Sequence, residues 1–184
     1  MGDHVCPWWL AYTFDNPLRA LFHKPDVMFA PYVKEGMTVA DIGCGLGYFS
    51  IGLARLVMES GRVVAVDIQE KMLEKMEHRV GKKGLGEIIH PIQCSGHDIG
   101  VAEPLDFALA FWMGHETRDV ERFFAQIYKT LKSEGALFLT EPRFHVSADE
   151  YQEELEIAAK VGFVVKEEPA VKFSYATVFK KPGD

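Results

Sequence analysis

The feature that most constrains this chain is a glycine-rich turn between an apolar run and a helical pattern. Residues 39–42 are short and apolar apart from Asp41, and they stop at Gly43, which is typical of the carboxyl end of a buried parallel strand. Gly43, Gly45 and Gly47 lack Cβ atoms at alternate positions, which permits positive φ and lets a ligand approach the main chain. Apolar residues then recur at helical spacing. The sequence therefore predicts a strand–turn–helix junction, where nucleotide-like ligands bind in open α/β sheets.

Two acids indicate which kind of ligand such a junction would take. A dinucleotide fingerprint needs a third glycine where this chain has Tyr48. Asp41 would repel a phosphate but could accept hydrogen bonds from an ammonium or a hydroxyl group, which favours a ligand with a cationic end. A second apolar run ends at Asp67, roughly 20 residues after the last glycine, where a carboxylate suits ribose hydroxyls. The competing interpretations are a turn without a ligand and, for Asp67, a helix N-cap.

These residues resemble those of a known enzyme family. Val-Ala-Asp-Ile-Gly-Cys-Gly-Leu-Gly-Tyr-Phe-Ser (residues 39–50) followed by Val-Val-Ala-Val-Asp (63–67) resembles the class I S-adenosylmethionine-dependent methyltransferases. The segments 111–116, 131–135 and 141–142 are similar to the methyltransferase type 11 and quinone-biosynthesis C-methyltransferase groups. The resemblance implies an α/β, Rossmann-like fold. Its seven-stranded sheet has the order 3-2-1-4-5-7-6, with strand 7 antiparallel and helices on both faces.

The resemblance also implies S-adenosyl-L-methionine as the cofactor and S-adenosyl-L-homocysteine as the product. The residues expected at the cofactor are Asp41, Gly43, Cys44, Gly45, Gly47, Asp67, Ile68, Met72 and Trp112. Family members usually carry an acid just beyond the third strand that touches the adenine amino group. Here Ser95 takes that position by its distance from the next strand, whereas Asp98 takes it by its chemistry, so both remain candidates.

Composition limits the classes of partner. The chain has 184 residues, 48% of them hydrophobic and 26% charged, which predicts one domain with one core. Its net charge of −7 argues against a nucleic-acid substrate, and no apolar run approaches the length of a membrane span. We expect a cytoplasmic monomer or homodimer that acts on a small-molecule acceptor. The three cysteines are widely spaced without a Cys-x-x-Cys pair, so no metal site is predicted.

The segment before the first strand is rich in aromatic residues. We divide the single domain of residues 1–184 into an N-terminal aromatic, helical lid segment (1–35) and a Rossmann-like core (36–184). Asn16 and Pro17 predict a helix entry, and a second short helix is expected over 26–32. Tyr12 is the preferred lid residue at the reacting groups. The alternative is that these aromatics only cover the sheet edge and outer helices.

Periodicity and caps predict the remaining elements. In chain order they are a helix over 69–82, an edge strand over 87–93 containing Pro91, a central strand over 105–113, a helix over 117–132 capped by Thr117, a strand over 136–140, a helix with a Ser147–Glu150 capping box that ends near Gly162, and an antiparallel hairpin of 163–167 with 171–179.

The central strand leads to Gly114, His115 and Glu116 at the edge where ligands gather. His115 is either a general base, oriented by Glu116 or another carboxylate, or a residue that orients structure or substrate. The resemblance implies a methyltransferase that moves a methyl group to a small molecule by in-line displacement. The alternative is a protein of the same fold that binds S-adenosylmethionine or S-adenosylhomocysteine without transfer activity.

Overall fold

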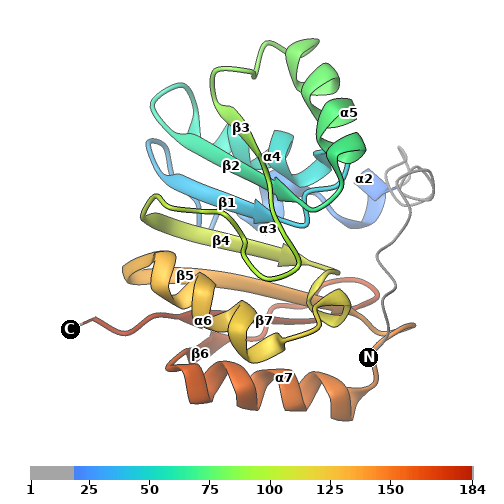
Figure 1. The fold of residues 1–184 in the computed structure, drawn as a ribbon, viewed down its shortest axis with the longest axis vertical. Coiled ribbons are helices and arrows are strands. Elements are labelled where there is room, and N and C mark those ends of the chain that lie inside the picture. The colour runs from blue at the N-terminus through green and yellow to red at the C-terminus, as the bar shows by residue number, and fades with distance from the viewer. Residues whose placement is uncertain (1–18, 184) are drawn as a thin grey trace.

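The computed structural model describes residues 19–183, which form a single sheet with helices packed against it (Figure 1). The strands are β1 (Thr38–Ile42), β2 (Arg62–Asp67), β3 (Ile89–Gln93), β4 (Leu105–Phe111), β5 (Leu131–Pro142), β6 (Val164–Glu167) and β7 (Ser174–Lys180). The helices are α2 (Arg19–Phe22), α3 (Pro25–Met28), α4 (Tyr48–Val57), α5 (Glu70–Gly81), the 3₁₀ turn η1 (Gly114–Glu116), α6 (Val120–Thr130) and α7 (Ala148–Val161).

The strand order confirms the predicted topology. The seven-stranded sheet runs β3-β2-β1-β4-β5-β7-β6, with β7 antiparallel to both β5 and β6. The chain between β6 and β7 is too short for a parallel crossover, so it can only reverse direction. β1 pairs in parallel with β2 and β4, and β4 pairs in parallel with β5, so their carboxyl ends lie at one edge of the sheet.

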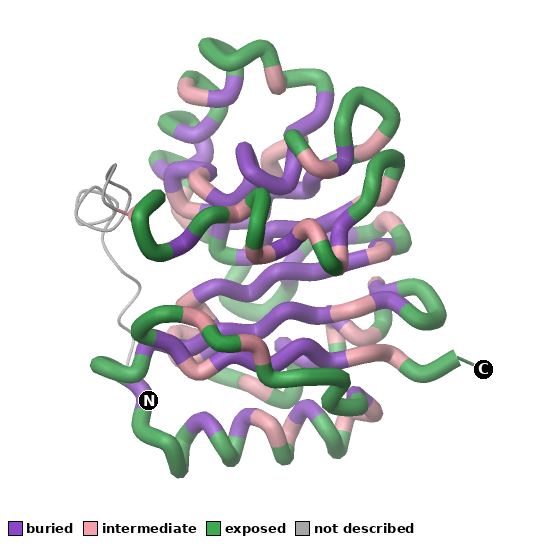
Figure 2. The backbone as a smooth tube through the Cα atoms, turned by 180° about the vertical axis from the view of Figure 1, so that it is seen from behind, coloured by how far each residue is buried: buried purple, intermediate pink, exposed green. Residues whose placement is uncertain are grey.

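Helices cover both faces of the sheet, as predicted. On one face α4 and α5 pack with Phe29 and Val33 against residues such as Phe107 and Phe138. On the other face α6 and α7 pack against the opposite side chains of the same strands. Figure 2 shows this burial as continuous through the central strands. By contrast, α5, α6 and α7 are buried along one side only, and α4 is buried along most of its length. Both faces of the central strands are covered, so their sequences read as apolar runs without alternation.

Several boundaries differ from the predicted ones, and at α6 and β5 the reason is that backbone geometry overrides the periodic pattern. The predicted helix over 117–132 is shorter, since Asp119, not Thr117, caps α6 by accepting a hydrogen bond from Arg122 N at 2.9 Å. The Thr117 hydroxyl instead donates to Gly114 O at 2.7 Å and closes η1. Leu131 has extended backbone angles and already pairs with Leu105, so β5 begins five residues before the predicted 136.

The N-terminal prediction is tested only in part, because Tyr12, Asn16 and Pro17 lie outside the described residues. The predicted helix over 26–32 is the shorter α3, which begins at Pro25. Phe29 is fully buried against the sheet, so this aromatic belongs to the core. Over residues 19–183, no helix combines the length and the apolar character that crossing a bilayer requires.

Candidate cofactor and catalytic site

The glycine loop between β1 and α4 is closely packed at Gly43 and Gly47 and open at Gly45. Gly43, Gly45 and Gly47 all have positive φ, at 76°, 53° and 78°. A Cβ on Gly43 would lie 2.9 Å from Met113, and one on Gly47 would lie 2.5 Å from Met76. Among residues 19–183, a Cβ on Gly45 would meet no heavy atom within 4 Å. The loop therefore exposes its main chain at Gly45, where a ligand can approach closely.

Asp67, at the end of β2, holds this loop in place. Its Oδ2 accepts a hydrogen bond from Gly45 N at 2.9 Å, and its Oδ1 accepts one from Gln69 N at 2.9 Å. Burial raises the pKa of the carboxyl group, while these backbone hydrogen bonds partly oppose the shift. Gln69, not Asp67, is the N-cap residue of α5, so Asp67 is not the helix cap considered above. The carboxylate links the open glycine to the edge of β2.

Two residues that follow Asp67 and were predicted at the cofactor, Ile68 and Met72, differ in exposure. Ile68 is 38% exposed beside Asp67, whereas Met72 is buried in α5. Cys44, inside the glycine loop, is also buried, and burial raises the pKa of its thiol well above the usual range. Cys44 is therefore a neutral packing residue of the loop, without the thiolate character that nucleophilic chemistry needs.

Asp41 is a buried acid beneath the same loop. The Ser50 hydroxyl donates a 2.5 Å hydrogen bond to its Oδ2. Burial raises the pKa of Asp41 to about 6, against the opposing effects of the Ser50 hydrogen bond and the positive charge of Arg19. A cation beside Asp41 therefore favours its ionised form.

A cation does lie in this region of the structure. The guanidinium carbon of Arg19, in α2, lies 4.5 to 5.6 Å from the ring centroids of Tyr48, Phe49, Phe111 and Trp112. Aromatic faces attract cations, and desolvation strengthens the attraction. The site near Asp41 thus accommodates a positive charge, as the sulfonium and ammonium groups of S-adenosylmethionine would require.

Ser95 and Asp98 form a tight turn after β3, and both remain candidates for the adenine. Their main chains form an isolated antiparallel bridge. The Ser95 hydroxyl accepts from Asp98 N at 3.1 Å, and the Asp98 carboxylate accepts from Gly100 N at 2.8 Å. Each side chain therefore also stabilises its own turn.

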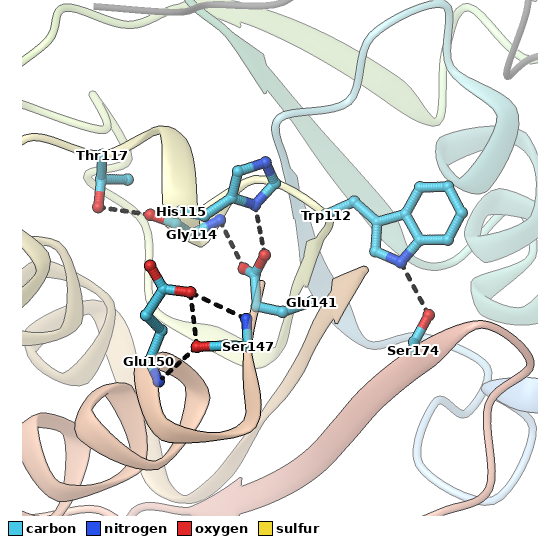
Figure 3. Close-up of polar contacts among 8 residues, drawn as sticks. All are labelled: Trp112, Gly114, His115, Thr117, Glu141, Ser147, Glu150 and Ser174. Carbon is cyan, nitrogen blue, oxygen red and sulfur yellow. Dashed lines mark hydrogen bonds and ion pairs between the residues drawn. The ribbon is translucent and has the colours of Figure 1, made fainter. Parts of the chain in front are cut away.

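His115 lies in η1, directly after β4, and its partner is Glu141 at the end of β5 (Figure 3). The Nδ1 atom of His115 lies 2.5 Å from Glu141 Oε2, and Glu141 Oε1 accepts from Gly114 N at 2.8 Å. Figure 3 shows the other ring nitrogen pointing away from Glu141. Burial lowers the pKa of His115, but the hydrogen bond and charge of Glu141 outweigh it and the net shift is upward. Glu141 therefore provides the orienting carboxylate, and Glu116 adds only a weaker electrostatic contribution.

Glu141 is a functional candidate that sequence reasoning missed, although a signal was present. It is an acid that follows an apolar strand at the carboxyl edge, as Asp41 and Asp67 are. Glu154, from α7, lies in the same region, and neither of its buried oxygens has a hydrogen-bond partner within the described part of the chain. Burial and the negative charge of Glu141 raise the pKa of the Glu154 carboxyl group, which favours its protonated form. No sequence signal separates Glu154 from the other acids of α7.

Trp112 belongs to the segment after β4 that relates the glycine loop to His115. Its φ of 60° is unusual for a residue other than glycine. Its indole Nε1 donates to Ser174 Oγ at 2.8 Å, and its ring packs against those of Phe111 and His23. Because β1 and β4 are parallel neighbours, Trp112 and His115 follow β4 at the same sheet edge as the glycine loop. The structure thus brings the predicted cofactor residues and His115 to one edge, while Tyr12 lies outside the described residues.

Comparison with known proteins identifies the family. Residues 39–135 match the family model described as "Methyltransferase domain". The chain belongs to this methyltransferase family. The matched segment contains the glycine loop, Asp67, Trp112 and His115, and membership implies S-adenosylmethionine as the cofactor.

Individual relatives agree with this assignment. The chain is 28% identical over 127 residues to a carboxy-S-adenosyl-L-methionine synthase of Dichelobacter nodosus, covering 66% of this chain and 52% of that protein. It is 27% identical over 110 residues to the ubiquinone/menaquinone biosynthesis C-methyltransferase UbiE of Klebsiella pneumoniae, covering 59% and 44%. The chain therefore spans about half the length of these curated relatives.

The fold also has a close match among solved structures. A SAM-dependent methyltransferase from Aquifex aeolicus superposes with a TM-score of 0.86 at 23% identity, covering 96% of this chain and 100% of that one. At this identity the likeness establishes the fold alone.

Proposed function

We propose that this chain transfers the methyl group of S-adenosylmethionine to a small-molecule acceptor by in-line displacement. The observation that carries the proposal is the pair of acids near the ends of the neighbouring strands β1 and β2, Asp41 and Asp67, together with the open main chain at Gly45. The Asp41 carboxylate lies in a region that accommodates a cation. The Asp67 carboxylate accepts a hydrogen bond from Gly45 N in the loop. This arrangement suits a ligand with a ribose at one end and a cationic amino acid at the other.

Each predicted residue then has a role toward the cofactor. Asp67 accepts hydrogen bonds from the ribose hydroxyls, and Asp41 favours the cationic methionine end. Gly43 and Gly47 keep the loop tight, with Cys44 packed beneath it. The other contacts come from Ile68 and Met72 beside the ribose and adenine, Ser95 or Asp98 at the adenine, and Trp112 near the reacting groups.

His115 is the general base of the proposed reaction. A carboxylate only accepts hydrogen bonds, so Glu141 keeps the proton of a neutral His115 on Nδ1 and leaves Nε2 able to take one. S-adenosylmethionine supplies a methyl group already activated by its sulfonium. As the acceptor nucleophile bonds to the methyl carbon, the carbon–sulfur bond breaks with its electron pair on sulfur, and the acceptor proton moves to Nε2 of His115.

We extend the proposal to the whole chain as one methyltransferase domain, with residues 1–35 as a lid that the core residue Phe29 anchors to the sheet. Its described part supports this role at one point, because His23, directly after α2, packs on Trp112 and hydrogen-bonds to Lys172 O at 3.0 Å. The lid would hold the acceptor in line with the methyl group and exclude water. Tyr12 is the residue we assign to the acceptor within it.

An acceptor screen tests this proposal. The protein is incubated with S-adenosylmethionine and a library of small nucleophiles, and S-adenosylhomocysteine formation is followed against an Asp67→Ala control. We expect acceptor-dependent product that the control reduces. Binding without any product would favour the cofactor-binding alternative, and product only with RNA would overturn the small-molecule assignment.

A further inference from the structure

A surface depression lies at Phe144, whose ring packs against Trp112. Its volume is about 470 Å³, and it is lined by Arg143, Phe144, Val171 and Phe173. The Phe144 ring meets Trp112 edge to face at a centroid distance of 5.5 Å. Phe144 and Phe173 remain 64% and 55% exposed, which is unusual for two large aromatic side chains in one depression. The lining therefore offers aromatic surface that the described chain leaves uncovered.

Arg143 gives this apolar depression a positive charge. Its Nε donates to Ser174 O at 2.9 Å, and its guanidinium carbon lies 4.4 Å from the Tyr175 ring centroid. These contacts fix the position of the side chain without neutralising it. Within residues 19–183, no carboxylate forms an ion pair with Arg143. A fixed guanidinium without a counter-ion in this part of the chain is locally complementary to an anion.

Ser174 connects the depression to the reaction site. Its hydroxyl accepts the hydrogen bond from Trp112 Nε1, and its carbonyl oxygen accepts the one from Arg143. At the opposite side, Phe22 of α2 meets the Phe173 ring edge to face at 5.4 Å. Lys172 Nζ lies 5.1 Å from the Phe22 ring centroid and adds a second cation near the edge. The depression thus lies between the residue proposed near the transferred methyl group and the first described helix of the lid segment.

We propose that this depression binds the methyl acceptor, and that the acceptor is a flat, apolar molecule carrying a carboxylate. This inference rests on the proposed function and specifies its substrate class. Phe144 and Phe173 contact the apolar part, for which edge and face packing of aromatic rings is favourable. The two Nη groups of Arg143 bind the carboxylate as a fork, which a lysine cannot reproduce.

Direct binding tests the assignment without requiring turnover. The probes are 2-naphthoate and its neutral amide, 2-naphthamide, titrated calorimetrically into the full chain with and without S-adenosylhomocysteine. A charge-assisted pair should make the carboxylate bind about tenfold more tightly than the amide. Arg143→Gln should remove that difference, and Arg143→Lys should restore part of it.

Arg62→Gln serves as the matched control. Arg62 opens β2 at the opposite end of the strand from Asp67 and pairs with Glu103 at 3.2 Å, so the preference for the carboxylate should persist. Circular dichroism of each variant separates a lost ligand contact from a lost fold. Equal affinity for the two probes, no binding of either, or an unchanged preference in Arg143→Gln would overturn the inference.

The binding experiment and the test of methyl transfer can fail independently of each other. If the carboxylate preference holds while no acceptor is ever methylated, the depression remains an anion-selective site and the methyl-transfer proposal fails. If methyl transfer occurs but the carboxylate preference is absent, the methyl-transfer proposal holds and the acceptor class assigned here is wrong.

Discussion

His115 lies directly after β4 and Glu141 lies at the end of the neighbouring parallel strand β5, and their side chains meet with 2.5 Å between Nδ1 and Oε2. The carboxylate is fully buried and is held on its other oxygen by Gly114 N. The pair therefore has one orientation, set by the sheet and not by a flexible loop. This fixed orientation is what a general base needs.

Replacing His115 with alanine should lower kcat by at least about a hundredfold while S-adenosylmethionine affinity stays within a few-fold. Removing the imidazole takes away the proton acceptor but none of the residues assigned to the cofactor. The measurement is steady-state kinetics with an acceptor from the screen, together with calorimetric titration of the cofactor. His78→Ala, on the exposed face of α5, is the matched control. A kcat within a few-fold of the parent would show that catalysis rests on positioning alone.

The activity should rise with pH through an apparent pKa above 6.5. The base must be unprotonated, and the hydrogen bond and charge of Glu141 raise the pKa of His115 above that usual value, despite the opposing effect of burial. Glu141→Gln removes the negative charge, so its pH profile should shift to lower pH, with reduced kcat because the ring is less firmly oriented. The pH dependence of kcat checks this. If the pH dependence of kcat is the same in Glu141→Gln as in the parent, Glu141 does not set the pKa of the base.

The glycine loop and the antiparallel strand β7 could be predicted from the sequence because their signals are local, whereas the full strand order was implied by the family resemblance. Asp41 and Asp67 each lie near the end of an apolar run. The connection between β6 and β7 is so short that the two strands must be antiparallel. Glu141 ends its run in the same way, but the sequence does not specify its side-chain partner. The His115 contact depends on β4 and β5 being neighbours, which is a property of the whole sheet.

Other features depended on tertiary packing and had no local signal. Glu154 occupies a buried position of α7 that periodicity would assign to an apolar residue. Arg143 lies in a connection, and its importance becomes visible only when β7 brings Ser174 and Tyr175 beside it. The early start of β5 likewise reflects the pairing of Leu131 with Leu105, which overrides the helical pattern before it.

Asp67→Ala should weaken S-adenosylmethionine binding by about tenfold or more. The carboxylate would accept ribose hydroxyls while it also accepts from Gly45 N, and charge-assisted hydrogen bonds contribute roughly 1.5 to 3 kcal/mol each. Calorimetric titration measures the change, with Asp149→Ala in the exposed first turn of α7 as control. Unchanged affinity would mean that Asp67 serves only to hold the loop.

S-adenosylmethionine should also bind more weakly as the pH falls below about 6. Burial raises the pKa of Asp41 to about 6, and below that value the protonated acid no longer favours a cationic ligand. Asp41→Asn should bind weakly at every pH and lose this dependence. Titrations at several pH values between 5 and 8 test the point, and a pH-independent affinity in the parent protein would contradict the role of Asp41.

The central claim is methyl transfer, and isotopic tracing of the methyl group measures it most directly. The protein is given S-adenosylmethionine labelled with ¹³C in its methyl group together with an acceptor from the screen, and both products are quantified by mass spectrometry. We predict equal amounts of S-adenosylhomocysteine and ¹³C-methylated acceptor, with both reduced in Asp67→Ala and His115→Ala. Tight cofactor binding with no label on any acceptor would contradict the account.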